Sequence, residues 1–171
     1  MPCLSRTQVN ARRSPAMPGK QPTELKKRPL WKCPACGQRF VTSNMSHSCG
    51  HHSIEEHFYD KRPEIRELFD ALVRAARSIG PVHVYAQKTR IVFQTRGRFV
   101  AVTPRKSHLG GHLWLKRSRP HPLIHRIDSL GRDFVHNFRL TRLEELDAGF
   151  YDLLREAYSV GKQEFDAELV D

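Results

Sequence analysis

The sequence lacks any apolar run long enough to cross a lipid bilayer. A membrane-spanning helix needs about 18 or more consecutive apolar residues, and no stretch of the 171 residues approaches that length. Residues 1–30 also lack the apolar segment of a secretory signal. These two absences predict a cytoplasmic protein with no membrane contact.

Familiar catalytic signatures are missing as well. The chain has no glycine-rich phosphate loop, no Gly-x-Ser-x-Gly elbow and no His-Glu-x-x-His zinc-protease motif. The sequence therefore assigns no catalytic residue, and it favours a binding protein over an enzyme.

Cysteine is scarce but clustered. Of the four cysteines, Cys3 stands apart and is predicted to be an idle thiol, whereas the other three fall within seventeen residues. In a reducing compartment such clustering indicates a metal site, and a Cys-x-x-Cys turn followed by a close His and Cys supplies the four soft donors of a closed zinc tetrahedron. The spacing predicts one structural Zn²⁺ in a zinc-knuckle module over residues 31–52, with these ligands: Cys33, Cys36, His47 and Cys49.

Two alternatives to this ligand set remain open in the sequence. Cys33-Pro34-Ala35-Cys36 is also typical of a redox dithiol, although such motifs open a helix, and the residues after Gly37 favour a turn and a strand. The fourth ligand has competitors by proximity, namely His51, His52 and His57.

Residues 1–30 have no hydrophobic period. They carry five prolines and seven basic residues against one acidic residue, which predicts a flexible basic tail. Met17 is an alternative start site within this tail.

The rest of the chain, residues 53–171, changes its hydrophobic period twice. Ser53 and Glu56 form a capping box that predicts a short helix over about 54–60, and Pro63 begins an apolar stripe that predicts a helix ending at Gly80. A period of two then predicts short strands at 83–85, 91–95, 99–103, 113–117, 124–130 and 134–140. Thr141 with Glu144 predicts the cap of a last helix. This order predicts a two-layer α+β domain, in which a five- or six-stranded antiparallel meander carries both helices on one face.

Charge is unevenly distributed along this domain. Residues 81–139 carry twelve basic and two acidic residues, a net charge of +10, whereas residues 140–171 carry three basic and nine acidic residues, a net charge of −6. Alternation assigns one apolar set to the helix-covered face: Ile91, Phe93, Phe99, Ala101, Leu113, Leu115, Phe134 and Phe138. Gln94 and Asn137 then point to the other face with most of the candidate binding residues, which are Lys88, Arg90, Arg96, His112, Trp114, Lys116 and Arg139.

A basic face around an exposed tryptophan is suited to nucleic acid, because the indole stacks on bases while Arg and Lys hold phosphates. The simpler alternative is a solubilising face on which a loop covers Trp114. Two further functions stay open: a protein-interaction module that uses the same face, and a small-anion-binding protein or enzyme built on Lys88, Arg90, His112, His136 or Arg139.

Several segments together resemble the bacterial domain-of-unknown-function family numbered fifty-six fifty-five. The resemblance is carried by these segments: Trp31 to Gly50, Gln87 to Ile91, Val102 to Lys106, Val135 to Leu140 and Leu154 to Tyr158. It covers about residues 31–165 and implies a zinc knuckle ahead of a small α+β domain. It implies no established activity.

Overall fold

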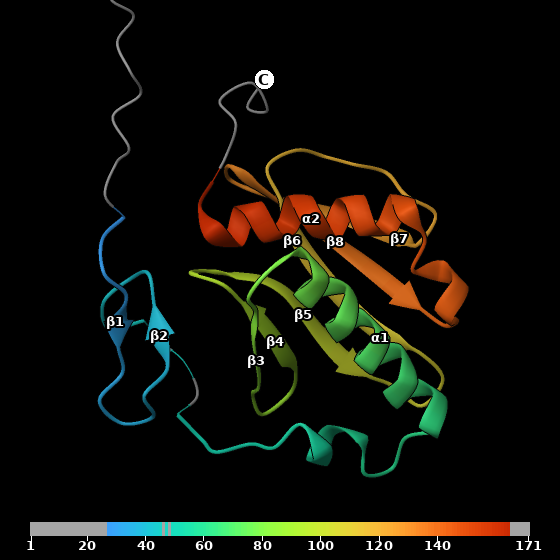
Figure 1. Cartoon of the computed structure of the whole chain (residues 1–171), viewed down its shortest axis with the longest axis horizontal. Coiled ribbons are helices and arrows are strands. Elements are labelled where there is room, and N and C mark those ends of the chain that lie inside the picture. Colours follow the sequence, from blue (N-terminus) through green and yellow to red (C-terminus); the bar gives the residue numbers. More distant parts are fainter. Residues whose placement is uncertain (1–26, 46, 48, 165–171) are drawn as a thin grey trace, which may run out of the picture.

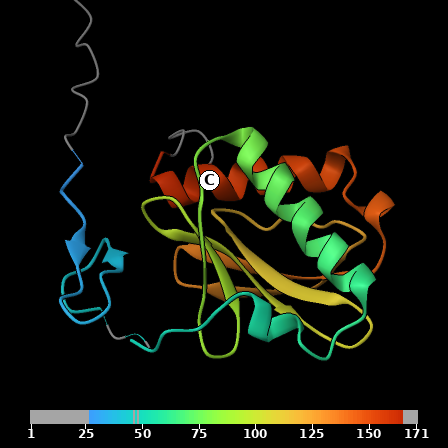
Figure 2. The same ribbon diagram turned by 60° about the horizontal axis from the view of Figure 1, so that its bottom comes forward.

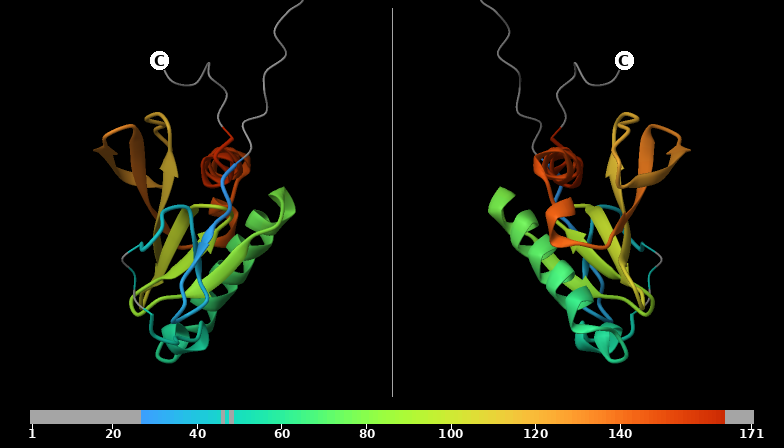
Figure 3. Two further views of the ribbon diagram at one scale, coloured as in Figure 1. Left: turned by 90° about the vertical axis from the view of Figure 1, so that its left-hand side faces the viewer. Right: turned by 90° about the vertical axis from the view of Figure 1, so that its right-hand side faces the viewer.

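The structure is a computed structural model, and it describes residues 27–45, 47 and 49–164. Cys3 and most of the predicted tail lie outside the described residues. The main body is a six-stranded antiparallel sheet with two α-helices packed against one of its faces (Figures 1 and 3). The predicted two-layer α+β fold is therefore confirmed.

The strand order departs from the predicted meander at one end. The order is β3-β4-β5-β6-β8-β7, so that β8 pairs with β6 and β7 forms the outer edge. The proline-containing segment 116–123 carries the chain past the position next to β6, and a turn with Gly131 at φ 62° then folds β8 back into that position. The strand bounds are β3 His83–Ala86, β4 Ile91–Gln94, β5 Arg98–Pro104, β6 Leu109–Leu115, β7 Ile124–Leu130 and β8 Asp133–Leu140.

The first helix, α1 (Pro63–Ile79), follows its sequence signals closely. Pro63 occupies the first turn, where its missing N–H costs nothing, and the helix ends before Gly80. One stripe of α1 is buried against the sheet: Ile65, Leu68, Phe69, Leu72 and Ala76.

The second helix, α2 (Ala148–Lys162), begins later than predicted. Its N-cap is Asp147, whose carboxylate accepts a hydrogen bond from the Phe150 N–H at 2.8 Å. The predicted pairing of Thr141 with Glu144 is wrong by one residue, because Glu145 accepts from the Thr141 backbone N–H and caps a separate 3₁₀ turn, η2 (Leu143–Glu145).

One register shift changes the face of a predicted core residue. The β4–β5 ladder is irregular between Phe93 and Gln94, so that Phe99 and Val100 are both buried in the main core. Ala101 consequently lies on the opposite face, in a small apolar cluster with Tyr85 and Val92. Its assignment to the helix-covered face was wrong because strict alternation does not hold across a bulge.

The predicted metal-binding segment forms a small unit beside the β3–β4 edge of the body, which we call the metal module (residues 31–52). It contains a two-stranded sheet of β1 (Trp31–Lys32) and β2 (Arg39–Phe40). Figure 2 shows the module to one side of the sheet, joined to α1 by a segment that carries η1. The short helix predicted there is a single 3₁₀ turn, η1 (Glu55–Phe58), with Ile54 at its N-cap. The hydroxyl of Ser53 accepts a hydrogen bond from the Glu56 N–H, which is one of the two bonds of the predicted capping box.

Neither α1 nor α2, the two α-helices of the described ranges, combines the length and apolarity that a membrane crossing requires.

Candidate metal centre and basic sheet face

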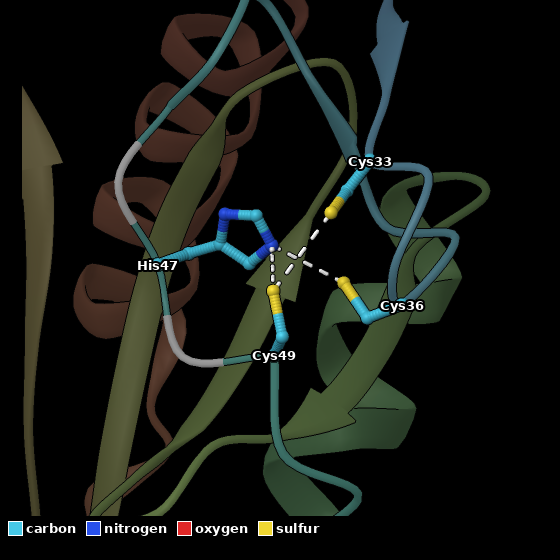
Figure 4. A group of neighbouring side chains, drawn as sticks. All are labelled: Cys33, Cys36, His47 and Cys49. Carbon is cyan, nitrogen blue, oxygen red and sulfur yellow. Dashed lines mark hydrogen bonds between the residues drawn. The ribbon is translucent and has the colours of Figure 1, made fainter.

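The metal module brings the four predicted ligands together. The donor atoms of Cys33, Cys36, His47 and Cys49 all lie within 4.8 Å of one another. In Figure 4 the three sulfur atoms and Nε2 of His47 face a common centre. These four residues are close enough to hold one metal ion.

Individual distances lie near those of a tetrahedral site, although two of them are shorter. Metal–ligand bonds of about 2.0–2.3 Å place tetrahedral ligands about 3.5–3.8 Å apart. Cys33 Sγ lies 3.8 Å from Cys49 Sγ, and His47 Nε2 lies 3.2 Å from both Cys36 Sγ and Cys49 Sγ. The donor set therefore fits a single tetrahedral ion.

The other nitrogen of His47 has a partner that fixes the ring. Nδ1–H donates a hydrogen bond to the Met45 carbonyl oxygen at 2.6 Å, which leaves Nε2 as the free lone pair that a metal requires. The ring also packs against Phe40, with centroids 4.4 Å apart. This arrangement places His47 with the three cysteines, whereas His57 donates from Nε2 to the Gln87 carbonyl oxygen at 2.8 Å.

The Cys-x-x-Cys turn is shaped by its backbone. Cys33 N–H donates to the Gln38 carbonyl oxygen at 2.8 Å, and Gly37 N–H donates to the Cys33 carbonyl oxygen at 2.9 Å. Gly37 has φ 74°, a left-handed conformation that favours glycine. The backbone N–H of Cys36 lowers the pKa of the Cys33 thiol to about 6, as expected for a turn that stabilises thiolate.

The metal module is fixed to the body through the sheet face that the helices leave open, which we call the open face. The side-chain amide of Gln94 donates to the Arg39 carbonyl oxygen at 2.6 Å, and the Arg98 guanidinium lies 5.3 Å from the centre of the Phe40 ring. Gln94 points to the open face as predicted, but only 4% of it is exposed because the module covers it.

The uncovered half of the open face is hollowed at one end of the sheet. Two hollows, of about 610 and 250 Å³, share Thr103, Arg105 and His112. The larger extends to the β3–β4 turn and η1, and the smaller extends over β6 to β8 and β7. We call their union the basic hollow; its charged and histidine lining consists of Glu56, His57, Lys61, Lys88, Arg90, Arg105, His108, His112, His125 and Arg139.

Among the described residues, Lys61 is the one cation of the basic hollow that forms an ion pair, with Asp60; the other four do not. Within residues 27–45, 47 and 49–164, no ion pair or side-chain hydrogen bond engages Lys88, Arg90, Arg105 or Arg139. Burial, and then the Arg90 guanidinium, lowers the pKa of His112. Burial, followed by Arg139 and Arg105, lowers the pKa of His108. A site whose own charges repel further protonation is electrostatically suited to an anion.

The structure separates the predicted binding residues into two groups. Lys88, Arg90, His112 and Arg139 line the basic hollow. The others lie elsewhere: Arg96 donates to the Gln163 side chain at the end of α2, and Lys116 is ion-paired with Asp133. Trp114 is half-buried on the open face, edge-on to His112 with ring centroids 5.3 Å apart, and it lines neither hollow.

His136 faces the opposite side of the sheet from the hollow. It is fully buried, it pairs across the ladder with core residue Leu113, and its Nε2 accepts a hydrogen bond from the Arg119 N–H at 2.9 Å. The prediction that His136 could contribute to a small-anion-binding site is therefore wrong, because the register turns its side chain into the core.

Several lining residues were absent from the predicted binding set, notably Thr103, Arg105, His108 and His125. All four lie near strand ends that converge at one end of the sheet. Strand order would have shown this convergence, since the end of β5 meets the start of β6 and the end of β8. The alternation of residues within a single strand does not show which strand ends meet.

Comparison with known proteins gives one positive result. No curated protein and no solved structure matches the chain significantly. The family model of a domain of unknown function, DUF5655, matches residues 54–161, which are 108 of the 171 residues. The expected extent of 31–165 is thus confirmed for the body, while the metal module lies outside the match. Because the match spans more than half of the sequence, the chain belongs to the DUF5655 family.

Proposed function

We propose that this protein is a non-enzymatic, zinc-containing binding protein that contacts nucleic acid through the basic hollow. The observation that carries the proposal is a set of four cations around one concave surface, Lys88, Arg90, Arg105 and Arg139, which have no ion-pair partner among the described residues. Phosphate contacts from Lys and Arg supply most of the affinity of nucleic-acid-binding proteins.

Zinc is the ion that the donor set favours. Three thiolates and one imidazole are soft to borderline donors, and a tetrahedral arrangement of such donors is typical of structural zinc. All four positions are supplied by Cys33, Cys36, His47 and Cys49, which leaves none for water or substrate. We therefore assign the ion a structural role: it closes the metal module.

The acidic residues of the body are arranged so that they do not cancel this charge. Glu156 on α2 forms ion pairs with Arg117 and Arg119, at 3.2 and 3.0 Å, on the helix side of the sheet. Glu56 is the one acidic side chain in the described lining of the hollow, and it lies 4.0 Å from His52. The lining of the hollow therefore carries more positive than negative charge, which attracts anions.

Salt-dependent binding tests this function directly. Fluorescence anisotropy with labelled oligonucleotides, measured from low salt to about 0.2 M, should show affinity that falls steeply as counterions compete. The double variant Arg90→Gln/Arg139→Gln should bind about tenfold more weakly or worse.

The matched control is Arg74→Gln/Arg77→Gln, which removes the same charge from exposed positions on α1. It should bind within about twofold of wild type. Absence of binding at low salt, binding that is indifferent to salt, or an equal loss in both double variants would overturn the proposal. Elemental analysis of the same preparation should find one zinc per chain.

A second candidate function has its own support in the size of the smaller hollow. A volume of about 250 Å³ suits a small phosphorylated ligand as well as one nucleotide of a chain. Competition by inorganic phosphate at millimolar concentration, without measurable oligonucleotide binding, would favour this small-anion function.

A further inference from the structure

Two adjacent glycines in β6, Gly110 and Gly111, have different reasons to be glycine. A Cβ at Gly111 would lie 2.4 Å from the Phe138 ring and 2.9 Å from the Ala101 carbonyl oxygen, so packing under the helices requires glycine there. A Cβ at Gly110 would lie 3.6 Å from the His108 ring and 3.7 Å from the Thr103 carbonyl oxygen, which are ordinary contacts. Packing therefore does not explain Gly110.

Gly110 lies on the open face and lines the smaller hollow. Its ladder partners are Thr103 on β5 and Arg139 on β8, so it sits between the two strands that carry the phosphate-binding candidates. Glycine inside a strand weakens the strand, and it often marks a place where a ligand approaches the backbone closely. At Gly110 the bottom of the hollow, which we call the floor, is therefore formed by backbone atoms, with charged side chains on both sides.

The hollow continues across the sheet from this floor. The larger part joins it at Thr103, Arg105 and His112 and reaches Lys88 and Arg90 in the β3–β4 turn. Cations thus stand at both ends and in the middle of one concave track. The half-buried His112 lines the shared part, between the cations.

The concave shape distinguishes between forms of nucleic acid. Proteins read duplexes by inserting a helix, a ribbon or long side chains into a groove. In the smaller part of this hollow, the middle strand contributes Gly110, so no side chain projects from the surface there. A protein that reads a duplex would instead have a projecting element at such a position. A single strand fits such a track, with its backbone along the cations and a base against an aromatic ring.

We propose that the basic hollow binds single-stranded nucleic acid, whose sugar-phosphate backbone passes over Gly110 between Arg105 and Arg139 while a base stacks on His112. This inference rests on the proposed function and specifies its ligand. Gly110 is the specificity-determining position, because any side chain there fills the track.

Substitution of the floor tests the proposal without changing charge. Gly110→Val keeps a residue suited to strands and adds two methyl groups to the track. Its matched control is Gly97→Val at the opposite end of β5, where an added Cβ would meet only the Gly161 carbonyl oxygen at 3.6 Å. With an oligonucleotide of about 12 nucleotides, Gly110→Val should weaken single-strand binding about tenfold or more, whereas Gly97→Val should stay within about twofold.

The duplex of the same sequence is the second probe. Wild type should prefer the single strand by about tenfold or more at equal salt. Should Gly110→Val fail to give the wild-type circular dichroism and melting curve, His112→Ala replaces it, with His83→Ala as the control outside the basic hollow; His112→Ala alone should lose single-strand affinity.

The outcomes separate the inference from the function on which it rests. If neither single strand nor duplex binds at low salt, the proposed function fails. If both forms bind equally, or if Gly110→Val and Gly97→Val bind the single strand alike, nucleic-acid binding stands and the single-strand inference is overturned.

Discussion

The α+β body and the metal module are stabilised by different kinds of interaction. The body buries a continuous apolar core between its helices and sheet, including Phe93, Leu113 and Phe138, each at most 1% exposed. Among the described residues of the module, the buried hydrophobic side chains are Cys33 and Phe40, and its four potential ligands lie around one point. A unit this small cannot bury enough apolar surface to fold by itself, so we expect metal binding to supply the missing free energy.

Among the described residues, few hydrogen-bonded or cation–π contacts join the two regions, so we expect the regions to be separable. Gln94 and Arg98 of the sheet meet Arg39 and Phe40 of the module through one hydrogen bond and one cation–π contact. Such an interface contributes far less than the core of the body. The body should therefore keep its fold when the module loses its own.

The largest expected effect is on the body, through its core. Phe138 packs edge-on against Phe150, with centroids 5.2 Å apart, and its ring covers Gly111. Phe138→Ala should lower the free energy of unfolding by about 3–5 kcal/mol, because it leaves a large cavity. Urea denaturation followed by circular dichroism measures this loss. Leu130→Ala, at a position 62% exposed, is the control and should change stability by less than about 0.5 kcal/mol.

Loss of the metal should break the module alone. We expect Cys36→Ser to abolish zinc binding and to remove amide protection from exchange in residues 31–50, because the serine hydroxyl is a poor replacement for a thiolate. The melting transition of the body should persist. Cys3→Ser is the matched control and should keep one zinc per chain. One cooperative collapse of the whole protein in Cys36→Ser would contradict the independence of the two regions.

The interface between the two regions gives a smaller effect. Gln94→Leu removes the donor to the Arg39 carbonyl oxygen and leaves that acceptor facing an apolar side chain, which should cost about 1–2 kcal/mol. Hydrogen exchange should then speed up at Arg39 and its neighbours while zinc content stays at one per chain. Unchanged exchange would mean that the module is held by its remaining contacts alone.

Helical periodicity predicted the body well because both helices bury a single stripe against one surface. Pro63 and Gly80 mark the ends of α1, which buries the apolar stripe that the sequence predicted, and α2 buries one stripe too, although it begins later than predicted. The order of the strands in the sheet was harder to predict from the sequence. Whether β7 or β8 lies next to β6 depends on the path of segment 116–123, and local alternation contains no information about that path.

The two candidate sites differ in the same way. The potential metal ligands lie within seventeen residues and are joined by short turns, so sequence spacing predicted which side chains meet, apart from the choice among neighbouring histidines. The basic hollow collects side chains from η1, the β3–β4 turn and the ends of four strands. Arg105 and His125 could be placed there only after the pairings β5–β6 and β7–β8 were known, and Arg96 was misplaced because its turn bends toward α2.

The smallest expected effect is a pH dependence of the body, which the buried His136 provides. Its Nδ1–H donates to the Phe134 carbonyl oxygen at 3.3 Å and its Nε2 accepts from the Arg119 N–H, so the folded state holds a neutral ring. Burial lowers the pKa of His136 below its ordinary value of 6.5, although the Phe134 carbonyl and Glu156 oppose that shift and Arg119 adds to it. Between the lowered pKa and 6.5 the unfolded chain binds more protons than the folded one, so stability must fall as pH falls through this window.

His136→Gln should reduce this dependence, because a glutamine can keep the acceptor for Arg119 and does not titrate. The fall in melting temperature of the body between pH 7 and pH 5 should be smaller in the variant than in wild type. The comparison is made on the transition of the body, since acid also protonates the ligands of the metal module. An equal fall in both proteins would contradict this prediction. It would assign the acid sensitivity to His108 and His112 on the open face, whose pKa values burial also lowers, and not to His136 in the core.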